Sequence, residues 1–153
     1  MQTILLIGTG PMAIEYSKVL LAMNKKFIVV GRGSKSALLF EQKTGIIPEL
    51  GGLDLYLKEK KLNKNTLAII ATGTETLMSI IHQLLKSGVE KILVEKPAAI
   101  SIDELLENEQ FLKPYESSIF IAYNRRFYAS VIEAQKLITE DGGLESMHFE
   151  FTE

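Results

Sequence analysis

Short apolar runs recur along the chain, and each is bounded by turn or polar residues. They are Ile4–Ile7, Phe27–Val30, Leu67–Ala71, Ile92–Val94 and Ile119–Ala122. Continuous apolar runs of this length are typical of strands that are covered on both faces, as in a parallel sheet. We therefore expect these segments to be strands.

Helical periodicity occupies the stretches between the runs. Apolar residues recur at three- and four-residue spacing from Met12 to Met23 and from Leu77 to Leu85, the spacing of an amphipathic helix. Ser101 and Glu104 form a capping box. It predicts a further helix, whose apolar stripe is Ile102, Leu105, Leu106 and Leu112.

The segment Gly45–Lys61 is less regular, and we expect a short strand at Ile46–Ile47 followed by a helix at Leu53–Lys60. Alternation of strands and helices with short connections predicts an α/β fold with a Rossmann-type, doubly wound parallel sheet. This domain is expected to span residues 1–123.

The last thirty residues break the alternation. An amphipathic helix is predicted from Phe127 to Ile138, and Asp141-Gly142-Gly143 ends it. Met147–Thr152 then alternates apolar and polar residues, which is typical of a strand with one solvent-exposed face. Residues 124–153 therefore read as a crossover helix and first strand of a truncated second domain. Pairing of two such exposed strands predicts a homodimer.

Composition narrows the classes of function. A net charge of -2 without a basic block gives no reason to expect a nucleic-acid partner. No apolar run approaches the roughly 20 residues that span a bilayer, and the start lacks a basic leader, so we expect a cytoplasmic protein. His82, expected on the exposed side of its helix, and His148 have no partner at ligand spacing, so no metal site is predicted.

A glycine-rich turn directly follows the first apolar run. Gly8-Thr9-Gly10-Pro11-Met12-Ala13 has the pattern GxGxxA and opens a predicted helix. The first glycine permits the tight turn, the second lets the backbone approach a pyrophosphate, and the alanine permits close packing. Because a helix N-terminus attracts anions, we expect Gly8, Thr9, Gly10, Pro11 and Met12 to bind a dinucleotide.

The end of the second predicted strand indicates which dinucleotide. An NAD site places a carboxylate there, but this chain has Gly31-Arg32-Gly33-Ser34-Lys35. The planar guanidinium of Arg32 suits a 2′-phosphate, and Ser34 and Lys35 add donors. NADP is therefore the expected cofactor, with NAD as the second choice.

Two further motifs, taken with the glycine turn, resemble one family. Glu95-Lys96-Pro97 ends a predicted strand, and Tyr123-Asn124-Arg125-Arg126-Phe127 follows the next one. With GxGxxA, they make the chain similar to the N-terminal, dinucleotide-binding half of the glucose–fructose oxidoreductase and inositol dehydrogenase (Gfo/Idh/MocA) family. Asp141–Glu145 resembles its turn into the second domain, with Glu145 in place of a glycine.

The resemblance implies roles for individual residues. Lys96 would be the catalytic residue, hydrogen-bonded to the substrate hydroxyl beside the nicotinamide, and Glu95 would face the cofactor. Asn124 would lie near the nicotinamide, and Thr72 would contact cofactor oxygens. The loop after Thr72 departs from the family pattern, because Thr74 and Leu77 stand where an asparagine and a histidine are usual.

The sequence therefore predicts an NADP(H)-dependent oxidoreductase, or an N-terminal fragment of one, that moves hydride to or from a sugar-like substrate. This chain alone is expected to be inactive, since the family's later catalytic groups belong to the second domain. One alternative is a cofactor-binding module without activity. A methyltransferase is a weaker alternative, since it leaves Glu95-Lys96-Pro97 and Arg32 unexplained.

Overall fold

A computed structural model describes residues 3–62, 64–148 and 150 of the chain. The chain divides into two compact units, Met1–Ala122 and Tyr123–Glu153.

The first unit is built on a five-stranded parallel sheet in the described range. Its strands are β1 (Thr3–Ile7), β2 (Phe27–Val30), β3 (Thr66–Ile70), β4 (Lys91–Val94) and β5 (Ile119–Ile121). The spatial order is β2-β1-β3-β4-β5, with every pairing parallel. This confirms the predicted strands and the Rossmann-type fold class.

The predicted strand at Ile46–Ile47 is wrong. Those residues lie in a loop, and Glu49 makes a single parallel bridge to Val30 of β2. The reason is Pro48, which has no backbone N–H to extend a ladder. The loop still runs beside β2, because the N–H of Glu49 donates to Val29 O and the N–H of Gly31 donates to Glu49 O, both at 2.8 Å.

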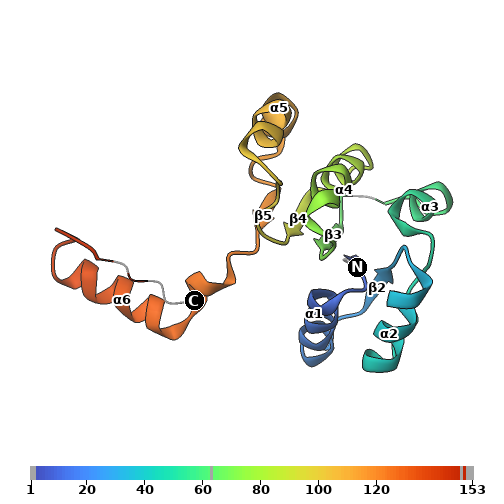
Figure 1. Cartoon of the computed structure of the whole chain (residues 1–153), viewed down its shortest axis with the longest axis horizontal. Coiled ribbons are helices and arrows are strands. Elements are labelled where there is room, and N and C mark those ends of the chain that lie inside the picture. Colours follow the sequence, from blue (N-terminus) through green and yellow to red (C-terminus); the bar gives the residue numbers. More distant parts are fainter. Residues whose placement is uncertain (1–2, 63, 149, 151–153) are drawn as a thin grey trace. The chain divides into compact units, whose positions relative to one another are not determined.

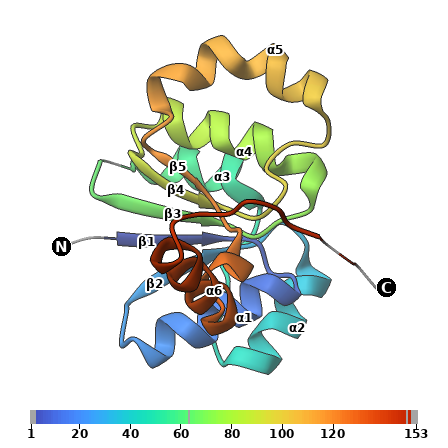
Figure 2. The same ribbon diagram turned by 90° about the vertical axis from the view of Figure 1, so that its left-hand side faces the viewer.

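Helices cover both faces of the sheet (Figure 2). On one face lie α1 (Pro11–Ala22) and α2 (Ser34–Thr44). On the other face lie α3 (Gly52–Glu59), α4 (Thr74–Lys86) and α5 (Ile102–Leu112), followed by the 3-10 helix η1 (Lys113–Tyr115). Figure 1 gives their order along the chain.

Each face has its own apolar core. Ala13, Ile14 and Leu20 of α1 pack with Phe40 of α2 against one face. Against the other face pack Leu53 and Tyr56 of α3 with a run of apolar residues of α4, which are Leu77, Ile80, Ile81, Leu84 and Leu85. Since the carboxyl ends of the strands meet at one edge, the two layers leave a crevice between them.

Ser101 caps the start of α5 as predicted, but Glu104 accepts from the N–H of Ile100 and not, as in a strict capping box, from the N–H of Ser101. The backbone N–H of Glu104 donates to Ser101 Oγ at 3.1 Å, and the N–H of Ile100 donates to Glu104 Oε2 at 2.7 Å. The apolar stripe that follows stays largely uncovered, since Ile102 is 67% exposed and Leu106 is 59% exposed.

His82 does not lie on the exposed side of its helix, contrary to the sequence-based prediction. It is half-buried, and its ring stacks on Phe111 with the ring centroids 4.0 Å apart. Phe111 belongs to α5, an element whose contact with α4 the local pattern around His82 did not reveal. The Nε2 atom of His82 is buried and has no hydrogen-bond partner among the described residues.

The second unit contains the 3-10 helix η2 (Asn124–Phe127) and α6 (Ala129–Glu140). The predicted helix is therefore present. It ends at Glu140, and its C-cap residue Asp141 precedes two glycines with positive φ, Gly142 and Gly143. Of the predicted strand Met147–Thr152, residues 147, 148 and 150 have no strand assignment, and the rest lie outside the described residues. In the described range, no helix is long and apolar enough to cross a membrane.

Candidate functional site

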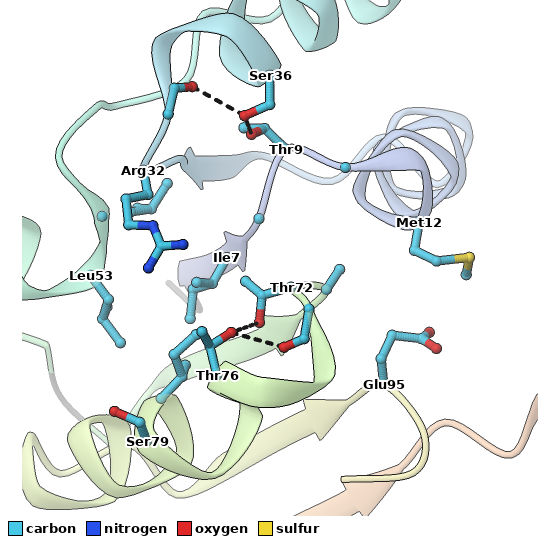
Figure 3. A pocket seen from close by; sticks show the side chains of 18 of the residues that line it. Ile7, Thr9, Met12, Arg32, Ser36, Leu53, Thr72, Thr76, Ser79 and Glu95 are labelled. Carbon is cyan, nitrogen blue, oxygen red and sulfur yellow. Dashed lines mark hydrogen bonds between the residues drawn. The ribbon is translucent and has the colours of Figure 1, made fainter. Parts of the chain in front are cut away.

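A cleft of about 770 Å³ opens at the carboxyl ends of the strands in the first unit. It is lined by residues at the ends of β1, β2, β3 and β4 and by residues of α1, α2, α3 and α4 (Figure 3). Its volume lies in the range of small-molecule and cofactor sites. The cleft sits where α1 and α4 leave the neighbouring strands β1 and β3 toward opposite faces, the usual ligand position in such sheets.

Gly8 is required by the turn between β1 and α1. Its φ is +119°, and a Cβ there would lie 2.2 Å from the carbonyl oxygen of Ala71. Its N–H donates to Val30 O at 2.9 Å. Any side chain at this position would therefore push β1 and β3 apart at the base of the cleft.

The backbone at Gly10 borders open space in the cleft. A Cβ built on Gly10 would meet nothing within 4 Å, so the glycine is not needed for packing. Gly10 is also the N-cap of α1 and has no side chain to cap the helix, and Pro11 occupies the first turn. The turn thus leaves an open space in front of uncapped N–H groups, which fits a pyrophosphate.

Charge differs among the helices that begin at the cleft. The first turns of α1 and α2 contain no acidic residue, whereas α3 carries Asp54 and α4 carries Glu75. The Glu75 carboxylate lies against Gly73, where a Cβ would be 2.4 Å from Glu75 Oε1. At the N-termini of α1 and α2, no acidic side chain in the first turn offsets the positive end of the helix dipole. These two N-termini are therefore the more favourable positions for an anion.

Arg32 lies at one end of the cleft, beside Leu53 and opposite Ser79 (Figure 3). It makes no ion pair with any residue of the described range. Ser36 lines the cleft nearby, accepts a hydrogen bond from Thr9 Oγ1 at 2.9 Å and donates to Gly33 O at 3.1 Å. Ser34 and Lys35 are exposed and do not line the cleft.

The residues of the Glu95-Lys96-Pro97 motif lie at the other end. Glu95 and Lys96 both line the cleft, Glu95 half-buried and Lys96 exposed. The backbone N–H of Glu95 donates to Ile70 O at 3.0 Å, which extends the pairing of β3 and β4 to the motif. Figure 3 places Glu95 near Met12 and far from Arg32, so the cleft has two chemically different ends.

Tyr16 is a site residue that sequence reasoning missed. Its hydroxyl donates to Glu95 Oε1 at 2.7 Å, which ties α1 to the end of β4. Burial, and then the hydrogen bond to the Glu95 carboxylate, raise the pKa of Tyr16 well above its usual value. In the sequence, Tyr16 is only one of the apolar-face positions of the helix predicted from Met12 to Met23, and no local signal reveals a partner 79 residues away.

Replacing Tyr16 by phenylalanine should lower stability and change its dependence on pH. Near neutral pH the loss of one hydrogen bond should cost about 1 kcal/mol of unfolding free energy. The pKa of Tyr16 is higher in the folded than in the unfolded state. The contribution of the Tyr16 hydroxyl to the free energy of unfolding is therefore complete below the ordinary pKa of 10.0 and falls as pH rises above that value. Urea unfolding of both proteins should therefore converge in alkaline solution.

Tyr123→Phe is the control, because Tyr123 is exposed. The free energy of unfolding of Tyr123→Phe should depend on pH in the same way as that of the unmutated protein. A constant gap between Tyr16→Phe and the unmutated protein up to strongly alkaline pH would contradict the hydrogen bond to Glu95.

The remaining predicted residues divide between the units. Gly8, Thr9, Gly10, Pro11, Met12 and Thr72 all line the cleft. Thr72 is held in place because Thr76 Oγ1 donates to Thr72 Oγ1 at 2.9 Å. Asn124 is the first residue of η2 and belongs to the second unit. Among the described residues, no group of acidic and histidine side chains has the arrangement of a metal site.

The parallel sheet, the glycine turn and the cleft define a dinucleotide-binding domain of the Rossmann class. The family model described as "Oxidoreductase family, NAD-binding Rossmann fold" matches residues 2–123. The chain therefore belongs to the Gfo/Idh/MocA oxidoreductase family. No curated protein has a sequence that matches it.

Solved structures share the fold at low sequence identity. An oxidoreductase from Agrobacterium radiobacter in complex with NAD+, L-tartaric acid and magnesium has a TM-score of 0.73 and 18% identity, over 94% of this chain and 42% of that one. Scyllo-inositol dehydrogenase from Lactobacillus casei, with NAD(H) and scyllo-inositol, has a TM-score of 0.74 and 14% identity, over 92% and 41%.

A putative NADPH-dependent oxidoreductase from Desulfitobacterium hafniense has a TM-score of 0.72 and 17% identity, over 92% of this chain and 40% of that one. The chain thus spans about two fifths of the length of the solved structures that it resembles.

Proposed function

We propose that this chain is the cofactor-binding half of an NADP(H)-dependent oxidoreductase that acts on a hydroxyl or carbonyl group of a sugar-like substrate. The observation that carries the choice of NADP is Arg32. It lines the cleft without an ion-pair partner in the described range and directly precedes Gly33, the N-cap residue of α2, which has no side-chain cap. A guanidinium in that position suits a phosphate dianion better than a ribose hydroxyl.

Each part of the cofactor has residues that fit it. The uncapped first turn of α1, with Gly8, Gly10 and Met12, would hold the pyrophosphate. Arg32 and Ser36 would hold the 2′-phosphate, and Thr72 would contact the phosphate or ribose oxygens. Asp54 also lines the cleft, and its negative charge sets a limit on how strongly a 2′-phosphate is favoured.

The chemistry of the other end follows from Lys96. The bound nicotinamide supplies the hydride chemistry. Lys96 would donate a hydrogen bond to the substrate oxygen and exchange a proton with it. The Glu95 carboxylate, held by the Tyr16 hydroxyl, would fix the backbone that carries Lys96.

We further propose the arrangement of the whole protein. Residues 1–123 form the cofactor domain, and residues 124–153 contain the crossover helix and the start of a substrate and oligomerisation domain. Substrate turnover and homodimer formation are expected only when that domain is supplied in full, and a cytoplasmic location accords with the cofactor.

Titration of the purified chain with dinucleotides tests the proposal. NADPH should bind about 10- to 100-fold more tightly than NADH, as charge-assisted hydrogen bonds of about 1.5–3 kcal/mol predict. Enhanced nicotinamide fluorescence or calorimetry measures both affinities. Equal affinities would overturn the choice of NADP, and binding of S-adenosylmethionine in place of either dinucleotide would overturn the redox function.

A further inference from the structure

Two hydroxyl groups join the glycine turn after β1 to the start of α2. Thr9 Oγ1 donates to Ser36 Oγ at 2.9 Å, and Ser36 Oγ donates to the carbonyl oxygen of Gly33 at 3.1 Å (Figure 3). The first of these bonds connects residues that are 27 positions apart in the chain. The side chain of Thr9 therefore belongs to a link between two turns of the cleft.

This link reaches both chain neighbours of Arg32. On one side, a Cβ built on Gly31 would lie only 2.7 Å from Thr9 Cγ2, so Gly31 packs directly against the Thr9 methyl group. On the other side, Gly33 is reached through Ser36. Thr9 is only 7% exposed, so its neighbours restrict its movement. The backbone that carries Arg32 is thus held on both sides by contacts that begin at Thr9.

The direction of the hydrogen bonds decides what Ser36 can offer to a ligand. A hydroxyl group has one proton to donate and two lone pairs to accept. Because Thr9 donates to Ser36, the proton of Ser36 points away from Thr9, toward Gly33 O. Ser36 is exposed and lines the cleft. Its proton can therefore turn to an oxygen atom in the cleft while the bond from Thr9 stays in place.

A phosphate and a ribose hydroxyl differ in what they require of Ser36. A phosphate dianion has acceptors only and gains from every donor that is aimed at it. A ribose hydroxyl can donate as well as accept, so it can bond to Ser36 whichever way the proton of Ser36 points. A donor whose direction is fixed in advance also loses less freedom on binding. The bond from Thr9 should therefore favour a phosphate over a hydroxyl.

We propose that Thr9 is a positioning residue for NADP specificity, because its hydroxyl keeps Ser36 as a donor to the 2′-phosphate. The inference rests on the proposed function, since it concerns how the same site selects that phosphate. In this role the Thr9 side chain acts through Ser36 and makes no contact with the phosphate itself. Part of the choice of cofactor then lies in the glycine turn, outside the segment that carries Arg32.

The test measures the ratio of NADPH to NADH affinity by fluorescence titration. Thr9→Val keeps the branched shape and removes the hydroxyl. It should lower the ratio about three- to tenfold, the effect of weakening one hydrogen bond to a charged group, and should change NADH affinity by less than about a factor of two. Thr9→Ser keeps the hydroxyl and should keep the ratio. A purely structural role of Thr9 would weaken binding of both dinucleotides equally and leave the ratio unchanged.

A double-mutant cycle shows whether Thr9 acts through Ser36. Ser36→Ala should itself lower the ratio at least as much as Thr9→Val does, and it should fold normally because Ser36 is exposed. In the Ser36→Ala background, Thr9→Val should have no further effect on the ratio, since the Thr9 hydroxyl has no group left to orient. Equal reductions by Thr9→Val with and without Ser36 would overturn the inference.

Thr44→Val is the matched control. Thr44 Oγ1 donates to Phe40 O at 2.8 Å in the last turn of α2, and Thr44 does not line the cleft. This variant should keep the ratio of the unmutated chain, and thermal unfolding should show that all variants fold. An unchanged ratio in Thr9→Val would overturn the inference and leave the proposed function standing. Equal affinities of the unmutated chain for NADPH and NADH would overturn the choice of NADP itself.

Discussion

Replacing Gly8 by alanine should destabilise the first unit by about 2–4 kcal/mol, the sum of a steric and a conformational cost. The added Cβ would lie 2.2 Å from Ala71 O, in a backbone with φ of +119° that side chains rarely adopt. Neither β1 nor β3 can move away easily, since the two strands pair along their full length. Urea unfolding of the variant and of the unmutated chain measures the difference.

Substitutions at two other glycines separate the steric cost from the conformational cost. Gly45→Ala places a methyl group at φ of +72° with nothing within 4 Å, so it should cost only about 1 kcal/mol of conformational strain. Gly10→Ala has neither clash nor positive φ and should cost at most about 1 kcal/mol, for the loss of glycine at the N-cap of α1, yet it should bind NADPH at least tenfold more weakly. Equal stability of Gly8→Ala and Gly45→Ala would show that contact with Ala71 O is unimportant.

Arg32→Asp should reverse the cofactor preference. The substitution removes the guanidinium from the cleft and puts a carboxylate where ribose hydroxyls would otherwise bind, which is the arrangement of NAD sites. We expect NADPH affinity to fall by about 100-fold or more and NADH affinity to rise, on the basis of charge-assisted hydrogen bonds of about 1.5–3 kcal/mol each and the new repulsion. Parallel titrations with the two reduced dinucleotides give the ratio.

Lys43→Asp provides the control for charge. It makes the same change in the last turn of α2, away from the cleft, and should leave the ratio within about a factor of two, since exposed charges are screened over about 10 Å. Lys35→Asp measures directly whether Lys35 contributes from outside the cleft. A ratio that changes equally in all three variants would mean that net charge, and not Arg32, decides the preference.

The sheet was predictable because its signal is local. Each strand is a short apolar run between turn residues, and the structure places β2 at the predicted residues and shifts the others by one residue at most. The exception, Ile46–Ile47, failed because the apolar pair precedes Pro48, whose missing N–H outweighs two β-branched side chains. The glycine turn was predictable for the same reason, since all of its steric demands lie within a few residues.

The rest of the site depends on which side of an element faces the cleft. Arg32 and Ser36 line it while Ser34 and Lys35 do not, a distinction set by the direction in which α2 leaves the sheet. Tyr16 looked like an ordinary helix position, because its significance comes from its hydrogen bond to Glu95. The composition of the chain and the spacing of its apolar residues do not reveal contacts between residues so far apart in the sequence.

Pro48 and the short β5 also bear on how the protein resists aggregation. Both borders of a sheet offer unpaired backbone groups that can template a strand from another molecule. Here one border is followed by a loop that makes a single bridge beside a proline, and the other is a strand of only three residues. We expect these two features to hinder pairing of the apolar edge strands with strands of other copies of the protein.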